Sequence, residues 1–279
     1  MTALLPRIDH AVVNGLGELD GAAETYRRLG FQLTPRGHHT LGSSNHLAVF
    51  GSDYLELLGY EPGRVAERAD AWRYPPGLTG LVFKPPASPG FAAELQARGV
   101  EASAPREFSR PVDLPGGPQD ARFRVVDIDG AVPDGRVFFC HHYTPELVWR
   151  DAWRHHPNGA AGLAEFAIAT GDPARAAAPF AHLFGPDAIR PTSGGLALPA
   201  GDAQVLFLTA PEIARRYGPT APIPSDGGER MAALGLRVVS LDRVRAALLA
   251  GEVRGVEEAE ERIVVPATEA CGVVLSFGC

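Results

Sequence analysis

The sequence predicts an α+β protein built from about four tandem β-α-β-β-β modules. Four times in order, an apolar strand pattern is followed by an amphipathic helix pattern and then by further short strands. The copies recur at a period of roughly sixty to eighty residues, which is too long for a solenoid repeat and suits duplicated sheet modules. With 279 residues and 45% hydrophobic residues, the chain is long enough to build sizeable cores.

The first module covers residues 7–60. Its strands IDHAVV, NHLAVF and YLELL alternate in a way that suits strands facing a core on one side. Between the first two strands, apolar residues recur at helical spacing, and Gly30 follows where a helix commonly ends. The helical positions are Leu19, Ala22, Ala23, Tyr26 and Leu29.

The other three modules repeat this order, with helices expected at residues 91–99, 173–185 and 243–251. Two modules per domain is the natural division, so we expect one domain over residues 1–152 and a second over 160–279. The boundary falls in the polar, turn-rich segment DAWRHHPNGAAG, where His155 and His156 are expected to be solvated.

Charge and composition exclude several classes of protein. A net charge of -7 with dispersed arginines argues against general nucleic-acid binding. No apolar run approaches the ~20 residues of a membrane span, and the first strand begins too early for a secretory signal, so a cytoplasmic protein is expected. Cys140, Cys271 and Cys279 lack paired spacing and are expected to be reduced thiols, with Cys140 buried in a strand.

Several segments together carry a resemblance to a known family. IDHAVVN, AAETYRRLGF, HTLGSSNHLAVF and DYLELLG resemble the glyoxalase-like branch of the vicinal oxygen chelate superfamily, most clearly over residues 5–150, and FFCHHYTPELVW is similar to a strand-end motif of that branch. The resemblance implies two cupped mixed sheets, each made from two modules. It also implies a divalent metal inside the cup that chelates two neighbouring oxygens of a small-molecule substrate.

The resemblance assigns His10, on the first strand, and Glu56, on the fourth, as metal ligands. Imidazole with carboxylate suits Zn, Fe, Mn, Ni or Co, so the identity of the metal stays open. A histidine in an apolar strand can also be a core residue. Alternation places Glu56 on one face with Tyr54 and Leu58, but both faces of this strand are partly apolar, and Glu56 could face solvent instead.

The second module departs from the family pattern, because Gly80 falls where a second ligand is expected. His141 and His142 point to opposite faces of an extended strand, and the resemblance favours His142 as the ligand. His10, Glu56 and His142 would then leave an open coordination sphere. Besides Glu56, the catalytic candidate is Glu146, which could equally be a ligand, a general base or an exposed residue.

Five residues are candidates for substrate binding. Asn45 could donate a hydrogen bond but is also a common turn residue, while Arg122 and Arg124 share one strand face and could clamp a carboxylate or be solvated. The others are His46, which could orient a ligand, and Trp149, which could be a cavity wall or core. His39 is expected to face solvent.

The second half lacks the ligand pattern. Glu165 falls where His10 lies in the first module, but no acid appears at the fourth-strand positions. This half is expected to be a degenerate copy that serves as structural support, a lid or a surface for a possible homodimer.

The expected function is that of a metal-dependent lyase or isomerase acting on a small oxygenated metabolite through an enediolate. An extradiol-type ring-cleaving dioxygenase is the alternative enzyme. A metal-free protein that sequesters a drug or toxin is the alternative outside enzymes, because fold does not settle function.

Overall fold

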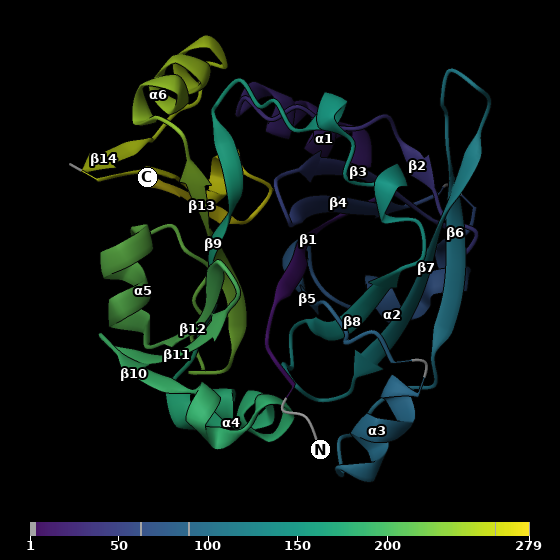
Figure 1. The fold of residues 1–279 in the computed structure, drawn as a ribbon. Helices are drawn as coiled ribbons and strands as arrows, with labels where there is room; N and C mark the ends of the chain where they lie inside the picture. The colour runs from purple at the N-terminus through teal and green to yellow at the C-terminus, as the bar shows by residue number, and fades with distance from the viewer. Residues whose placement is uncertain (1–3, 62, 89, 260, 279) are drawn as a thin grey trace.

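The computed structural model describes residues 4–61, 63–88, 90–259 and 261–278. It contains two eight-stranded mixed sheets, each assembled from two β-α-β-β-β modules (Figure 1). The predicted fold class is therefore confirmed. No helix within the described ranges is long and apolar enough to cross a membrane.

The first sheet has the strand order β2-β3-β4-β1-β5-β8-β7-β6. Its modules join at β1 and β5, which pair antiparallel, while β1 pairs parallel with β4 and β5 pairs parallel with β8. The strands are β1 (Ile8–Leu16), β2 (Gly37–His38), β3 (Ser43–Val49), β4 (Tyr54–Tyr60), β5 (Gly77–Phe83), β6 (Arg106–Val112), β7 (Gln119–Ile128) and β8 (Arg136–His142). The helices of this half are α1 (Leu19–Arg28), α2 (Ala69–Trp72) and α3 (Phe91–Ala97), with short 3-10 turns at Val65–Arg68, Pro145–Leu147 and Asp151–Trp153.

The second sheet repeats the topology in the order β10-β11-β12-β9-β13-β16-β15-β14. Its strands are β9 (Ala160–Ala169), β10 (Arg190–Thr192), β11 (Gly195–Ala200), β12 (Ala203–Leu208), β13 (Arg230–Val238), β14 (Glu257–Ala259), β15 (Arg262–Val265) and β16 (Val274–Gly278). Its helices are α4 (Pro173–Phe184), α5 (Ala210–Tyr217) and α6 (Leu241–Ala250), with 3-10 turns at Pro186–Ala188 and Ala267–Glu269.

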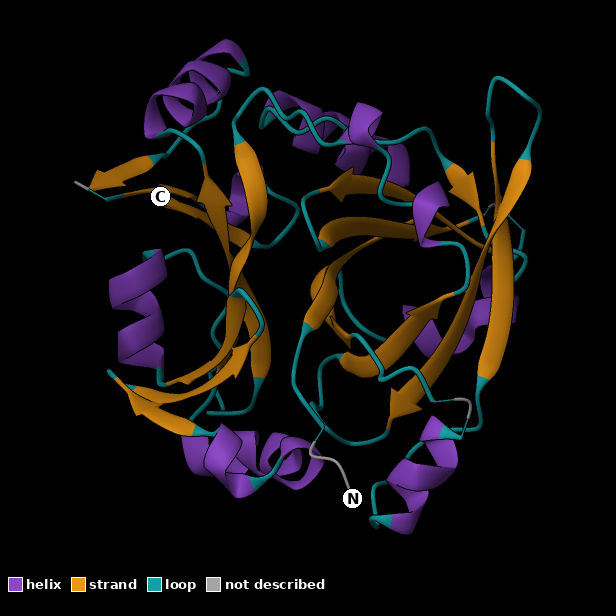
Figure 2. Ribbon diagram, viewed as in Figure 1, coloured by secondary structure: helices purple, strands orange, loops and turns teal. Residues whose placement is uncertain are grey.

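The two sheets differ in how far they curl. The edges of the first sheet meet, because the Thr40 N–H donates to the Ser109 carbonyl at 2.9 Å and the Ser109 N–H donates to Thr40 Oγ1 at 3.2 Å. This seam between the end of β2 and β6 turns the first sheet into a nearly closed barrel, called the first barrel below (Figure 2). The second sheet stays open and holds α5 against its concave face, where Ile213 and Tyr217 are fully buried.

The convex faces of both sheets share one hydrophobic core. Val13 and Phe83 from the first sheet belong to the same buried cluster as Phe166 and Leu234 from the second. Helices α1, α4 and α6 contribute to this cluster, whereas each concave face has a smaller cluster of its own. The two concavities therefore belong to different sheets and are separated by the shared core.

The connecting segment corrects one expectation. His155 is exposed, but His156 is only 2% exposed and is held by the first half of the chain. Its Nδ1 accepts from the Gln32 N–H at 3.0 Å and its Nε2 donates to the Val49 carbonyl at 2.9 Å. Burial explains why the pKa of His156 is lowered. The His156 side chain in the linker thus satisfies two backbone groups of the first half, the Gln32 N–H and the Val49 carbonyl.

Candidate functional site

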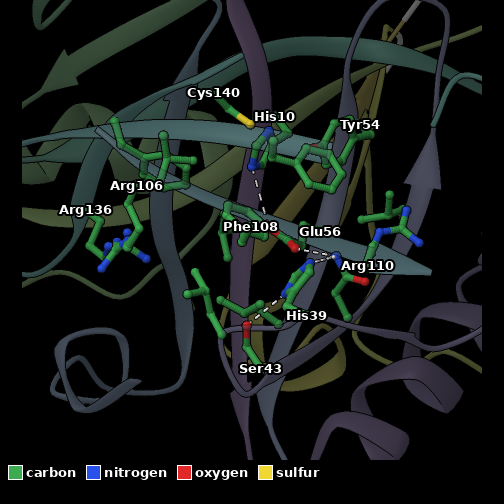
Figure 3. Close-up of a pocket in the computed structure, with 18 residues that line it drawn as sticks. His10, His39, Ser43, Tyr54, Glu56, Arg106, Phe108, Arg110, Arg136 and Cys140 are labelled. Atoms are coloured by element: carbon green, nitrogen blue, oxygen red, sulfur yellow. Dashed lines mark hydrogen bonds and ion pairs between the residues drawn. The ribbon is translucent and has the colours of Figure 1, made fainter. Parts of the chain in front are cut away.

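The first barrel encloses a cavity of about 50 Å³. Its walls are apolar and its polar side chains gather from β1, β3, β4, β6 and β8 (Figure 3). The apolar lining includes Leu47, Leu58, Phe108, Phe123, Val125 and Phe138. Since few of these groups can hydrogen-bond, the polar residues dominate the chemistry of the interior.

His10 and Glu56 meet inside this cavity. His10 is 3% exposed, and its Nε2 lies 3.5 Å from Glu56 Oε2. The ring is fixed on its other side by Asp9, whose Oδ1 lies 2.6 Å from His10 Nδ1, and it stacks on Tyr54 at 4.2 Å between ring centroids. The structure therefore brings together the two residues that the resemblance pairs, with the imidazole orientation set by a carboxylate behind it.

Glu56 is also held from its other oxygen. Asn45 Nδ2 donates to Glu56 Oε1 at 2.6 Å, and the same amide lies 3.2 Å from His39 Nε2. With Nε2 as acceptor, His39 donates from Nδ1 to Ser43 Oγ at 2.8 Å. His39 is thus buried and lines the cavity, which corrects the expectation that it faces solvent. The sequence spacing between His39 and Asn45 did not indicate that their side chains meet inside the cavity.

The His10–Glu56 contact favours the charged forms of both groups. Burial alone would raise the pKa of Glu56, but the hydrogen bond and charge of His10 outweigh it and hold this pKa at about 2. Burial alone would lower the pKa of His10, but the hydrogen bonds and charges of Asp9 and Glu56 raise it. Asp9 itself has a pKa well below its usual range because the His142 charge and two histidine hydrogen bonds outweigh its burial.

His142, and not His141, faces the concave side. Its Nε2 lies 3.0 Å from Asp9 Oδ1, and its ring contacts Trp149 at 4.8 Å between centroids. Asp9, Cys140 and His142 offer ligand atoms that all lie within 4.8 Å of one another, and they form the one such group in the described part of the chain. Cys140 is buried as expected, and burial raises its pKa far above the usual value, so it is a thiol there.

The strand registers explain why the second module adds no ligand beside His10 and Glu56. Val12 pairs with Glu56 across β1 and β4, and its counterpart Val82 pairs with Phe138 across β5 and β8. Phe138 therefore stands where a second carboxylate would be, just as Gly80 stands where a second histidine would be. His142 lies further along β8 and does not form a close three-ligand group with His10 and Glu56.

The residues of the first module nevertheless fit a divalent ion. Two ligands at about 2.1 Å from one ion lie about 3 to 3.5 Å apart, and His10 Nε2 and Glu56 Oε2 are separated by 3.5 Å. Asn45 donates to Glu56 through its Nδ2. The Oδ1 of the same side-chain amide is buried and has no hydrogen-bond partner among the described residues. His10 and Glu56 would hold the ion, and its other positions would be left to water or substrate.

Four of the five expected substrate-binding residues, His46, Arg122, Arg124 and Trp149, do not line the cavity. His46 is buried on the opposite side of β3 from Asn45, where its Nδ1 contacts the Thr34 carbonyl at 2.8 Å. Arg122 and Arg124 project from the outer face of β7 and stack on Tyr143, at 5.3 and 5.7 Å from the ring centroid. Period-two alternation turns His46 and both arginines away from the cavity, which favours the alternative of a solvated strand face for the two arginines.

Glu146 and Trp149 follow the end of β8. Glu146 is exposed and does not line the cavity, which favours the alternative of an exposed residue, and a catalytic role for it stays a prediction. Trp149 packs over His142 and over Tyr54, at 5.7 Å between the latter centroids, and Lys84 Nζ lies 4.7 Å from its ring. Trp149 therefore supports the site residues from outside the cavity wall.

Sequence reasoning missed three arginines that line the cavity, Arg106, Arg110 and Arg136. Arg106 and Arg110 lie on β6, where REFSRPV places them on one face with Phe108, so period two could have identified them. Arg106 and Arg136 both bind Asp127, at 3.0 and 2.5 Å. Asp9 was also missed. The β1–β5 register shifts between Ile8 and His10, and this changes the direction of the Asp9 side chain from the one that strict alternation predicts.

The equivalent position in the second half carries no comparable site. Glu165 accepts a hydrogen bond from the Tyr217 hydroxyl at 2.7 Å and lies 3.7 Å from Arg216 Nη1. Both partners belong to α5, which occupies the concave face. A hollow of about 600 Å³ remains beside Glu165, but its charged lining residues include no histidine and therefore do not repeat the His10–Glu56 pair.

Comparison with known proteins gives a family and a fold. Residues 8–184 match a protein family described as "Glyoxalase-like domain". A hypothetical protein from Staphylococcus aureus is similar in structure, with a TM-score of 0.69, 12% identity and coverage of 98% of this chain and 99% of that chain. No curated protein matches the sequence at a significant level.

Two further solved structures share the fold. A mutant of 4-hydroxymandelate synthase from Streptomyces coelicolor has a TM-score of 0.57 and 13% identity, covering 98% of this chain and 92% of that one. A "xylose isomerase-like TIM barrel/4-hydroxyphenylpyruvate dioxygenase fusion protein" has a TM-score of 0.58 and 14% identity, covering 99% of this chain and 49% of that one. At these identities the likeness concerns the fold alone.

Proposed function

The chain belongs to the glyoxalase-like family of the vicinal oxygen chelate superfamily, and from this premise we propose that its first barrel is the active site of a divalent-metal-dependent enzyme. The substrate would be a small oxygenated metabolite and the chemistry that of a lyase or isomerase. The observation that carries this proposal is the His10–Glu56 pair, whose Nε2 and Oε2 atoms lie 3.5 Å apart in the cavity of the first barrel.

When bound, the ion would supply a Lewis acid that polarises a substrate carbonyl and stabilises an enediolate. The surrounding residues prepare the site for this role. Asp9 holds His10 so that Nε2 faces the cavity, and Asn45 holds Glu56 so that Oε2 faces His10. The apolar walls exclude water from the reacting atoms, which strengthens every electrostatic interaction inside.

Glu56 is also the group proposed to move a proton. It is the one carboxylate among the described residues that line the cavity, so its Oε2 can take a proton from a substrate carbon next to a polarised carbonyl. The charge of His10 makes Glu56 a weak base, with a pKa of about 2. Any change that neutralises His10 would therefore strengthen Glu56 as a base.

One observation favours a second candidate, a binding protein that works without metal. Gly80 and Phe138 leave the second module without ligands at the matched positions. An oxygen-consuming dioxygenase is a third candidate, distinguished by its need for ferrous iron.

The test is metal content in protein purified without chelators or an affinity-tag metal. We expect about one equivalent of a transition metal in the wild type, and its loss in His10→Ala and Glu56→Ala with the circular dichroism spectrum unchanged. His155→Ala is the matched control, because His155 is exposed in the linker. Absence of metal in the wild type after reconstitution would leave the binding protein as the better proposal, and oxygen uptake with ferrous iron would favour the dioxygenase.

A further inference from the structure

Arg110 lies in the cavity wall as a buried cation without a partner. It is 3% exposed, and its Nε and Nη2 have no hydrogen-bond partner among the described residues. No described carboxylate lies within ion-pair distance of its guanidinium. Because an unpaired buried charge is costly, a residue of this kind is better explained by a ligand than by stability.

The other charged side chains that line the cavity each contact an oppositely charged partner. Arg106 and Arg136 share Asp127 at one side of the cavity, and Glu56 pairs with His10 (Figure 3). Arg110 is left as the cation that an incoming anion would neutralise. Its two unpartnered atoms are Nε and Nη2, which form the edge of a guanidinium that donates two parallel hydrogen bonds to a carboxylate.

The position of Arg110 is fixed by its surroundings. A Cβ on Gly37 would lie 2.9 Å from Arg110 Cδ, 2.9 Å from its Nη1 and 2.7 Å from Asn45 Oδ1, so the absence of a side chain there gives the arginine its room. Arg110 pairs with Ala121 of β7, next to the seam that joins Ser109 to Thr40. Strand β6 fixes the backbone of Arg110, and the backbone at Gly37 packs against its side chain. The Nε–Nη2 edge is therefore held in place before a ligand binds, as a preorganised site requires.

We propose that the cavity binds a small monocarboxylate, whose carboxylate accepts two hydrogen bonds from Arg110 Nε and Nη2. The apolar part of the ligand would lie among Phe108, Phe123 and Phe138, and an oxygen next to the carboxylate would face the His10–Glu56 pair. This proposal names the substrate class of the proposed enzyme and rests on the proposed function only in using the same cavity.

The size of the cavity limits the ligand. An apolar cavity of about 150 Å³ accommodates benzene. The cavity here measures about 50 Å³ and is open on one side, so it suits the carboxylate end of a small carboxylic acid and excludes nucleotides and sugar phosphates. Acetate and pyruvate are therefore suitable probes, and acetamide is the neutral probe of matched shape.

The test is isothermal titration of acetate, pyruvate and acetamide into protein dialysed against EDTA, and again after metal loading. We expect both carboxylates to bind the wild type, acetamide not to bind, and Arg110→Met to weaken carboxylate binding about 10- to 100-fold. Arg110→Lys keeps the charge but not the double donor edge, so it should bind more weakly than the wild type. Arg122→Met, on the outer face of β7, should bind like the wild type.

Thermal unfolding separates a ligand role from a structural one. Arg110→Met should unfold at the same or a higher temperature than the wild type, because it removes an unpaired buried charge. Wild-type affinity in Arg110→Met, or no carboxylate binding by the wild type, would overturn the proposal. Carboxylate binding that depends on Arg110 in a protein that takes up no metal would overturn the proposed function alone, and metal uptake without carboxylate binding would overturn this inference alone.

Discussion

Asp9 organises more of the site than any other single residue. The β1–β5 register pairs Ile8 with Phe83 and His10 with Val82, which leaves Asp9 as the extra residue of a bulge. Asp9 can therefore contact both His10 and His142, at 2.6 and 3.0 Å, although strict alternation would turn it away from His10. Bulges are often found where a strand aims a side chain into a site, and this one fixes the orientation of the proposed metal ligand.

Asp53 is a buried carboxylate in a different role, since it joins the two halves of the chain. Its Oδ1 accepts from the Leu163 N–H of β9 at 2.8 Å, and burial raises its pKa to about 6. Below about pH 4 the carboxyl is protonated in both the folded and the unfolded protein, so it makes no difference to stability. Between about pH 4 and pH 6 the unfolded carboxyl ionises while the folded one stays protonated, so stability falls as pH rises through this range and is lowest above about pH 6.

We predict that Asp53→Asn stabilises the protein at neutral pH, because it removes the charge and keeps the oxygen that accepts from Leu163. The gain in free energy of unfolding should be about 3 kcal/mol at pH 8 and close to zero at pH 4, given a pKa raised from 3.8 to about 6. Urea denaturation of the variant and the wild type at both pH values, with EDTA present, measures it. An equal difference at the two pH values would contradict the assignment.

At the scale of elements, alternation along the strands decides which side chains enter the first barrel. On β6 it directs Arg106, Phe108 and Arg110 inward, while on β7 it directs Arg122 and Arg124 outward. A one-residue change of register would exchange these sets, so the bonds between Thr40 and Ser109 at the seam hold the positive side of the cavity in place.

Helix α5 is the element that separates the two halves in function. It begins after Thr209, has a proline at its start and buries Ile213 and Tyr217 against the second sheet. This helix was not expected from the sequence, where the segment follows the last strand of a module and reads as a connection. It packs against the second concave face, where the first sheet has its own apolar cluster and the cavity proposed here as the site.

We predict that Ile213→Ala lowers the free energy of unfolding by about 2 to 5 kcal/mol, because it leaves a cavity between α5 and the sheet. Urea denaturation measures the change. Arg215→Ala, on the exposed side of the same helix, should cost no more than about 1 kcal/mol. An equal cost for both variants would show that α5 does not pack against the second sheet in solution.

At the scale of the whole molecule, the two sheets depend on each other. Phe83 and Phe139 of the first half contact Phe184 of α4, at 5.0 and 6.2 Å between ring centroids. His156 and Asp53 add polar contacts across the same boundary. The shared core is larger than either concave cluster, so much of the apolar burial arises between the halves.

We predict that residues 1–152 expressed alone do not fold cooperatively, because the convex face of the first sheet would be exposed to water. The fragment should bind a hydrophobic dye and show no sharp thermal transition by near-UV circular dichroism. Co-expression with residues 153–279 is the control and should restore the transition. A fragment that unfolds as sharply as the full chain would instead support two independent domains.

The sequence by itself determined the module order and the pair His10 and Glu56. Strand alternation and helical spacing are local properties, and the family resemblance covers the residues that carry them. Gly80 also showed that the second module had departed from the family pattern. The possible homodimer stays a prediction, since a surface between copies leaves no local pattern of this kind.

Only the tertiary structure decided which neighbouring residues complete the site. His39 and Arg110 line the cavity at a sheet edge and beside a strand seam, while Asp9 contacts His10 and His142 from a bulge, and each placement depends on segments far apart in the chain. Glu146 is placed outside the cavity, because the chain leaves the sheet after β8. The physical reason is that each strand fixes the alternation of its side chains between the two faces, while the curl and register of the whole sheet fix which side chains come into contact.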